Sequence, residues 1–175
     1  PIPKIIEIVG RLDWIHGVWI DQEHAAVTHE KLEMLAIACR AAGLDAFARV
    51  APTDYATVMR PMETGAGGVM AAQIRSVSQV EQVVQWAKYP PFGARGLNMG
   101  NYEAGYGTAN VAEHVERANR DSWLTIQIET VEALDSVGKI AQVQGVDCLF
   151  VGPADLASNL GVPGQVMHPK LSLIH

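Results

Sequence analysis

The sequence predicts an α/β fold with parallel strands, arranged as in a (β/α)₈ barrel. Two observations lead to this prediction. Short runs of apolar and β-branched residues alternate along the chain with segments whose apolar residues recur at helical spacing. The polar residues of those runs lie at or just after their C-terminal ends, and a parallel barrel gathers such ends on the face that carries its active site.

A doubly wound sheet is the alternative with the same alternation of strands and helices. It also clusters the strand ends, but it usually has a glycine-rich phosphate-binding turn after its first strand. The sequence contains no GxGxxG motif, and GAGG at 65–68 lacks the Lys and Ser/Thr of a P-loop. The barrel arrangement is therefore favoured.

Five strands are expected along the chain. They are GVWID at 17–21, AFARV at 46–50, GVMAAQI at 68–74, WLTIQIE at 123–129 and CLFVGP at 148–153. Helical spacing predicts a helix over 32–39, before Gly43, and another over 80–87. Ser78 and Glu81 have the spacing of a capping box, which predicts that the second of these helices begins at Ser78.

Composition and charge exclude several classes of protein. The 175 residues and 49% hydrophobic content fit one globular domain, and 13 basic against 19 acidic residues with no basic cluster make nucleic acid an unfavourable partner. Cys39 and Cys148 lie in apolar stretches, which indicates core thiols and a reducing compartment. With no apolar run of membrane-spanning length and no signal-peptide pattern, we expect a cytoplasmic protein without a membrane partner.

Polar side chains at the expected strand ends predict a site on one face. They are Asp21, Glu23, His24, Arg49, Gln73, Gln127, Glu129 and Asp155. Glu129 and Asp155 follow neighbouring strands with no cysteine nearby, and such oxygen ligands suit a hard divalent ion such as Mg²⁺, Mn²⁺ or Co²⁺. The alternative is that each acid only caps the helix that follows it.

His24 and Arg49 each have a functional and a structural interpretation. A histidine directly after a buried strand can act as a base near neutral pH, although a lone histidine is more often structural. Arg49 lies between Ala48 and Val50 in an apolar strand, where a guanidinium needs an anion. That anion is either a ligand or a carboxylate of the protein, for which Glu63 and Asp54 are the options.

Six segments of the sequence occur in an order that resembles the HpcH/HpaI family of aldolases, and the likeness extends to about Lys170. The segments are IDQEH at 20–24, ARV at 48–50, METGAGGVM at 62–70, KYPPFGARGLN at 88–98, QIET at 127–130 and VGPADLASNLG at 151–161. The resemblance implies a partial TIM barrel that lacks the family's first strand and last two, since a complete barrel has about 250 residues. Residues 1–175 would form one incomplete barrel domain, with LSLIH at 171–175 as a possible non-family tail.

The resemblance also implies an activity and its ligands. Family members of this kind are class II aldolases, which cleave or form 4-hydroxy-2-oxo acids from pyruvate and an aldehyde. Glu129 and Asp155 would bind the divalent metal. The groups that hold the pyruvate part would be Gln127, Asp155 and the backbone of Gly152, Pro153 and Ala154.

Three further residues match catalytic positions of the family. His24 would be the acid/base, and Arg49 would stabilise the enolate, because it places a fixed positive charge where negative charge develops. Glu63 stands where most members have an aspartate that pairs with the catalytic histidine. A dyad of Glu63 with His24 is therefore expected.

Other expectations and alternatives remain open at this point. The resemblance implies a homo-oligomer, a hexamer in the full-length protein, and aldehyde specificity that depends on loops such as 96–107 and on neighbouring subunits. One alternative is an acyl-CoA lyase of the citrate lyase β-subunit or malyl-CoA lyase type. Another is a barrel fragment without catalytic activity.

Overall fold

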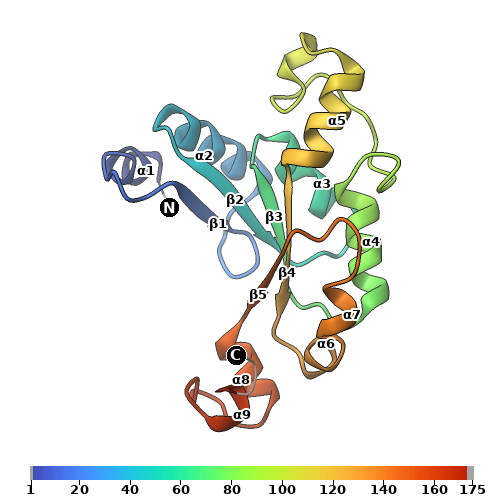
Figure 1. The fold of residues 1–175 in the computed structure, drawn as a ribbon. Helices are drawn as coiled ribbons and strands as arrows, with labels where there is room; N and C mark the ends of the chain where they lie inside the picture. Colours follow the sequence, from blue (N-terminus) through green and yellow to red (C-terminus); the bar gives the residue numbers. More distant parts are fainter. Residues whose placement is uncertain (1, 173–175) are drawn as a thin grey trace.

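The computed structural model describes residues 2–172, and it contains one sheet of five parallel strands with helices on its convex side (Figure 1). The prediction of a parallel α/β fold is confirmed. The strands are β1 (Gly17–Asp21), β2 (Asp45–Val50), β3 (Gly68–Ala71), β4 (Trp123–Ile128) and β5 (Cys148–Val151), and they lie in the sheet in this order.

The helices follow the strands in the alternation that the sequence predicts. They are α1 (Pro3–Val9), α2 (His29–Ala41), α3 (Tyr55–Glu63), α4 (Val77–Ala87), the 3₁₀ turn η1 (Gly105–Gly107), α5 (Val111–Asp121), α6 (Val131–Asp135), α7 (Val137–Ile140), α8 (Pro153–Asn159) and α9 (Pro169–Ser172). No helix of the described part is long and apolar enough to span a membrane. Of the expected tail at 171–175, residues 173–175 lie outside the described residues.

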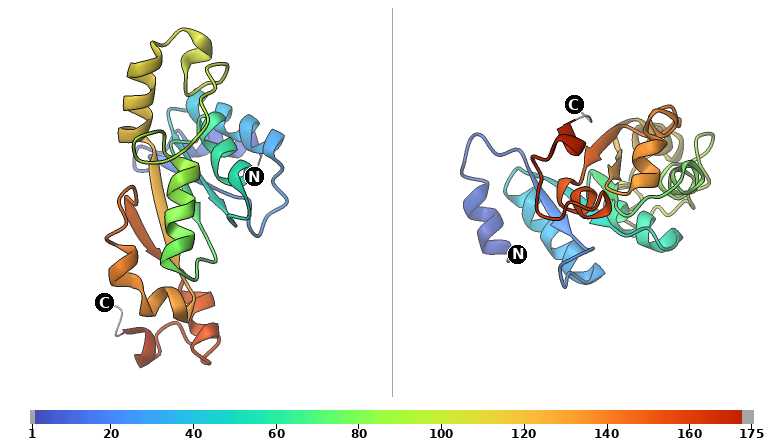
Figure 2. Two further views of the ribbon diagram at one scale, coloured as in Figure 1. Left: turned by 90° about the vertical axis from the view of Figure 1, so that its right-hand side faces the viewer. Right: turned by 90° about the horizontal axis from the view of Figure 1, so that it is seen from below.

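The sheet curves as part of a barrel, which two views at right angles show (Figure 2). Trp19 of β1 and Phe150 of β5 meet edge to face, with ring centroids 5.4 Å apart and ring planes at 88°. These strands are the two edges of the sheet, so the concave surface brings its opposite sides into contact. The expectation of a partial barrel agrees with this curvature.

Successive side chains of each strand point to opposite faces, so the convex and concave surfaces differ in composition. The convex face packs against the helices in two apolar clusters, one around α2 with β1 and β2, the other around α3 and α4 with β3 and β4. The helical residues predicted from spacing are buried in these clusters: Leu32, Leu35, Ala36, Cys39, Val80, Val83, Val84 and Ala87. Cys148 is only partly buried, so the expectation of a core thiol is wrong for that residue.

Two expected boundaries are corrected. Helix α4 begins after Ser76, whose hydroxyl accepts the N–H of Gln79 at 3.2 Å, while the Gln79 side chain accepts the N–H of Arg75 at 2.8 Å. The cap therefore lies two residues before Ser78. Strand β3 ends at Ala71 rather than at residue 74, because Gln73 adopts a left-handed backbone conformation with φ 56°.

The long segment at 89–107 lies at the end of the sheet where the strands begin (Figure 1). Helix α4 starts beyond the C-terminal end of β3 and runs back, so the segment starts at the opposite end. An ion pair within the segment stabilises its conformation. Arg95 is buried and donates to both carboxylate oxygens of Glu103, and its guanidinium lies 4.6 Å from the ring centre of Tyr89. Within one chain, loop 96–107 is therefore remote from the strand ends that carry the predicted site.

Close packing between β3 and β4 depends on Gly68. A Cβ atom there would lie 2.6 Å from the carbonyl oxygen of Trp123, whereas a Cβ on Gly138 would meet nothing within 4 Å. We expect Gly68→Ala to lower the free energy of unfolding by about 1–3 kcal/mol through overpacking. Gly138→Ala, in a helix, should leave it unchanged or raise it by about 0.4–1 kcal/mol. Urea denaturation measures both, and equal effects would contradict this reading of β3.

Candidate active site

Glu129 is the most deeply held polar side chain at the C-terminal ends of the strands. It follows β4 directly and is fully buried. Its Oε1 accepts the N–H of Gln73 at 2.7 Å, and its Oε2 accepts a hydrogen bond from the side-chain amide of Gln127. The Glu129 carbonyl accepts the amide of Asn159 at 2.8 Å, which ties α8 to β4. The carboxylate is therefore fixed by Gln73, just after β3, and by Gln127 of β4, while Asn159 of α8 holds the main chain of Glu129.

Negative charge is concentrated around Glu129. Burial raises the pKa of the Glu129 carboxyl above its usual range, against the lowering effect of the two hydrogen bonds, and the charges of Glu23 and Asp155 raise it further. Glu129 and Asp155, predicted to share a metal, are thus close enough to interact electrostatically. A cation at this place would relieve the repulsion among the three carboxylates.

Gly152, Pro153, Ala154 and Asp155 form the turn from β5 into α8, and this turn borders the Glu129 carboxylate. A Cβ atom on Gly152 would lie 2.7 Å from Oε2 of Glu129 and 2.9 Å from Nε2 of Gln127. Only a residue without a side chain allows this approach. The four residues predicted here and Gln127 are therefore brought together with Glu129.

Arg49 lies beside this group at the end of β2. Its Nε and Nη2 donate to the two carboxylate oxygens of Asp21 at 3.0 and 2.5 Å, and its Nε lies 3.2 Å from Oε2 of Glu23. The hydrogen bond that Arg49 donates to Asp21 is the main reason that the pKa of Arg49 is raised. The guanidinium also lies 4.9 Å from the ring centre of Trp19. Asp21 and Glu23 neutralise Arg49, so the alternative of an ion pair with Glu63 or Asp54 is wrong.

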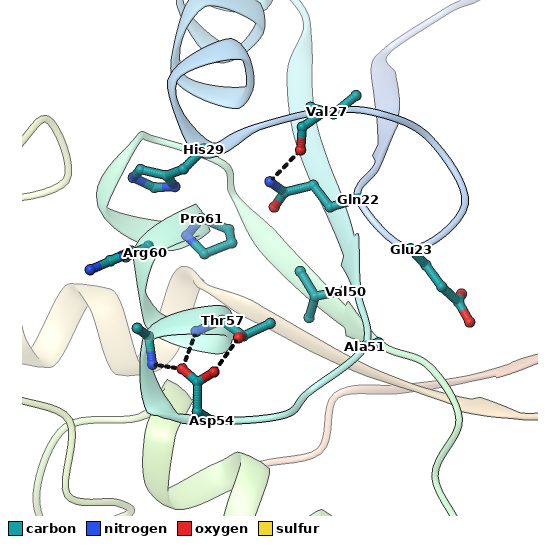
Figure 3. Close-up of a pocket in the computed structure, with 11 residues that line it drawn as sticks. Gln22, Glu23, Val27, His29, Val50, Ala51, Asp54, Thr57, Arg60 and Pro61 are labelled. Carbon is teal, nitrogen blue, oxygen red and sulfur yellow. Dashed lines mark hydrogen bonds between the residues drawn. The ribbon is translucent and has the colours of Figure 1, made fainter.

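Asp54 has a different role, as the close-up in Figure 3 shows. Its carboxylate accepts the N–H groups of Ala56 and Thr57 at 2.8 and 3.1 Å and caps α3. It lines a cavity of about 310 Å³ together with His29 and Arg60. Glu23 also lines this cavity, and its side chain points away from the other labelled residues.

Glu23 and Gln73 were among the strand-end polar residues but were not assigned a role from the sequence. The Glu23 side chain is only 6% exposed, and its Oε1 accepts the side-chain amide of Gln73 at 3.2 Å. Glu23 follows β1 and Gln73 follows β3, and these strands are separated by β2 in the sheet, so the contact depends on the curvature of the barrel. Position at a strand end was the sequence signal that could have assigned them to the site.

His24 and Glu63 are not brought together. His24 is exposed, with 61% of its side chain accessible, and its Nε2 lies 3.5 Å from Oε1 of Glu23. Glu63 is the last residue of α3, which runs from the C-terminal toward the N-terminal end of the strands, and it accepts the side-chain amide of Asn98 at 3.2 Å. Within the described chain no hydrogen bond or ion pair joins Glu63 to His24, and the expected dyad is replaced by a contact of His24 with Glu23.

The residues at this site fit a divalent cation. Oε1 of Gln127 is buried and lacks a hydrogen-bond partner in the described part of the chain, and the buried Oε2 of Glu23 has only its ion-pair contact with Nε of Arg49. Both atoms are acceptors. Gln127 bonds to the Glu129 carboxylate, and Glu23 is one of the charges that raise the pKa of Glu129. Residues 2–172 contain no group of three or more His, Cys, Asp or Glu side chains arranged to hold a metal. The protein would therefore supply two carboxylates and leave further positions to water and substrate.

Parallel strands in a partial barrel, with acidic groups at their C-terminal ends, place this chain among the (β/α) barrel proteins that carry their site on this face. The chain belongs to the HpcH/HpaI aldolase/citrate lyase family, whose profile matches residues 3–174. The resemblance drawn from the six sequence segments is confirmed. The chain is thus a member of a family of aldolases and lyases.

Individual relatives agree with this assignment. The chain is 34% identical over 161 residues to a hydroxypyruvate/pyruvate aldolase of Sagittula stellata, covering 91% of this chain and 61% of the relative. It is 33% identical over 159 residues to a 2-dehydro-3,6-dideoxy-6-sulfogluconate aldolase of Pseudomonas putida, covering 91% and 60%. The crystal structure of an HpcH/HpaI aldolase from Desulfitobacterium hafniense matches with a TM-score of 0.90 and 34% identity, covering 98% and 65%. The chain therefore spans about 60% of the length of these curated relatives.

The ion pair of Asp21 with Arg49 predicts a dependence of stability on pH. The Arg49 hydrogen bond, with the N–H groups of Glu23 and His24, lowers the pKa of Asp21 in the folded state. A lowered pKa contributes stability that is present above the unfolded value of about 3.9 and is lost as the pH falls through the folded value. Asp21→Asn should cost about 1.5–3 kcal/mol at neutral pH, as for a hydrogen bond to a charged group, and should flatten the acid limb.

Urea denaturation between pH 7 and pH 3 tests this prediction. Asp13→Asn is the matched control, because Asp13 is exposed and has no hydrogen bond among the described residues. If Asp21→Asn and Asp13→Asn lose stability in parallel with the unsubstituted protein as the pH falls, the ion pair does not contribute as proposed.

Proposed function

We propose that this chain carries the pyruvate site of a metal-dependent aldolase, which cleaves or forms 4-hydroxy-2-oxo acids with an aldehyde as the second product or substrate. The observation that carries the proposal is the buried carboxylate of Glu129, fixed by Gln73 and Gln127 and close to the charge of Asp155. Membership of the family and the aldolases among its relatives support it. The substrate of the whole protein is part of the same proposal.

Glu129 and Asp155 are the residues that would hold the cation, which is Mg²⁺, Mn²⁺ or Co²⁺. When bound, the cation supplies Lewis-acid polarisation of the keto oxygen of the 2-oxo acid. Gln127 and the backbone of Gly152, Pro153 and Ala154 would orient the carboxylate end of the substrate. The open approach that Gly152 gives to the Glu129 carboxylate supports this placement.

Arg49 would stabilise the enolate that forms when the carbon–carbon bond breaks. Asp21 fixes two of its nitrogens, so the guanidinium is already oriented before the substrate binds. A charge that needs no reorientation stabilises a developing oxyanion most effectively. This arrangement suits the enolate oxygen better than it suits a neutral ketone.

His24 would move the proton. In the cleavage direction it takes the proton of the 4-hydroxyl group, the bond between C3 and C4 breaks, the aldehyde leaves, and the electron pair remains on the pyruvate enolate. Protonation of C3 then yields pyruvate. Glu23, whose Oε1 lies 3.5 Å from Nε2 of His24, would have the role that the resemblance implied for Glu63.

A Schiff-base mechanism would need a lysine at this site. Lys88, a buried lysine at the C-terminal end of α4, donates to the carbonyl of Ser122 at 2.6 Å and pairs with Asp147 at 3.3 Å. Asp147 precedes β5, so this amine lies at the end where the strands begin. No lysine of the described residues bonds to Glu129, Arg49 or Gln127. These observations favour the metal-dependent route.

The second candidate function is an acyl-CoA lyase, because the matching family also includes citrate lyase. Turnover of malyl-CoA without turnover of free 4-hydroxy-2-oxo acids would favour it. For the assembly, we propose a homo-oligomer, a hexamer in the full-length protein.

Metal-dependent exchange of the pyruvate methyl protons tests the first half of the proposed reaction without an aldehyde. We expect exchange of pyruvate protons with D₂O, followed by NMR, in the presence of Mg²⁺ or Co²⁺, and its loss with chelator. Glu129→Gln should abolish both this exchange and Mn²⁺ binding measured by EPR, whereas Glu132→Gln, an exposed acid on α6, should change neither. Exchange that persists after metal removal would eliminate the metal from the mechanism.

Arg49→Ala should lower the exchange rate by about 100- to 1,000-fold, as the loss of an oxyanion-stabilising group does in other enzymes. The apparent affinity for pyruvate should change much less, because the guanidinium interacts mainly with the charge that develops in the transition state. Arg75→Ala is the control, since Arg75 forms an exposed ion pair with Glu132. An unchanged rate in Arg49→Ala would remove Arg49 from the chemistry.

A further inference from the structure

Gln73 has an unusual backbone conformation at the edge of the site. Its φ of 56° lies in the left-handed region, which a residue other than glycine adopts at a cost. The last main-chain bond of the strand before it is the one from the N–H of Ala72 to the carbonyl of Val50, at 2.9 Å. After this bond the chain turns, and the N–H of Gln73 leaves the sheet and points at Oε1 of Glu129.

The same residue contacts a second carboxylate through its side chain. Its Nε2 donates to Oε1 of Glu23 at 3.2 Å, so one glutamine bonds to carboxylates from the loop after β1 and from the end of β4. Both acidic side chains are withdrawn from solvent, since Glu129 is fully buried and the Glu23 side chain is only 6% exposed. Gln73 supplies a donor to each of them, and it is exposed at the rim of the site.

Glu23 lies at the centre of the remaining contacts. Its Oε1 is shared between the Gln73 amide and Nε2 of His24, at 3.2 and 3.5 Å, while its Oε2 faces Nε of Arg49 at 3.2 Å. A rotation of the Glu23 carboxylate would therefore alter its contacts with both His24 and Arg49. The Gln73 amide opposes such a rotation.

From these contacts we propose that Gln73 is a positioning residue of the reaction: its left-handed backbone directs an N–H to Glu129, while its side-chain amide fixes Glu23 against His24 and Arg49. It acts through these neighbours and does not itself bind the reacting atoms. The proposal rests on the function proposed above. It also explains why a strained conformation persists at this strand end, because strain is kept where surrounding contacts and function require it.

Two substitutions separate the backbone from the side chain. Gln73→Gly removes the amide and relieves the left-handed strain, so the melting temperature should rise or stay the same while the rate of pyruvate proton exchange falls. Gln73→Met keeps the length and the strain but removes the donor, and it should lower the same rate. The expected loss is about 10- to 100-fold in each case, the range for residues that orient groups bound to a metal.

Other readouts distinguish positioning from a general structural effect. The KM for pyruvate and the affinity for Mn²⁺, measured by EPR, should change less than about threefold in both variants, because the groups that bind substrate and cation remain and only the rate-determining geometry is lost. Gln142→Met is the matched control, since Gln142 is an exposed glutamine in the turn after α7, and it should leave every readout unchanged.

Each outcome tests a different part of the proposal. If both Gln73 variants exchange pyruvate protons at the rate of the unsubstituted protein, the positioning role is overturned while the proposed function stands. A fall in melting temperature of Gln73→Gly as large as that of Gln73→Met would overturn the argument from strain. If the unsubstituted protein binds Mn²⁺ but shows no metal-dependent exchange, the proposed function fails first and the role of Gln73 falls with it.

Discussion

The burial of one carboxylate, that of Glu129, is the constraint on which the site depends. A buried carboxylate is costly unless hydrogen bonds and opposite charge compensate it. Here the N–H of Gln73 and the amide of Gln127 provide the bonds, and the bare backbone of Gly152 leaves room for them. The remaining negative charge, increased by Glu23 and Asp155, creates a place that favours a cation. Glu129 at the end of β4 therefore requires hydrogen-bond donors and a compensating positive charge from its surroundings.

Arg49 and its partners form the complementary half of the site. The bidentate pair with Asp21 and the contact with Glu23 satisfy a guanidinium that would otherwise be costly in an apolar strand. The arrangement separates a rigid positive charge on β2 from the acidic group on β4. The 2-oxo acid proposed as substrate has this polarity, with oxygens that would bind a cation and a keto group that would become negative during the reaction.

The two ends of the barrel have different roles, and this explains where the structure differs from the expectations drawn from the sequence. The C-terminal ends of the strands hold the polar site, whereas the buried cations Lys88 and Arg95 organise the other end through Asp147 and Glu103. The loop at 89–107 belongs to that second end. The family resemblance implied a role of loop 96–107 in aldehyde specificity, whereas within one chain the ion pair of Arg95 with Glu103 and the contact with Tyr89 give this segment a structural role.

The sequence by itself determined the parallel α/β fold, the five strands, the family and the gathering of Gln127, Glu129, Arg49 and residues 152–155, because the period of apolar residues and position at a strand end are local properties. Only the tertiary structure decided which polar groups meet. Whether Arg49 pairs with Asp21 or Glu63, whether His24 meets Glu23 or Glu63, and where Gln73 directs its N–H depend on the direction in which α3 runs and on the curvature of the sheet. These are long-range relations between segments, and no pattern within a single segment encodes them.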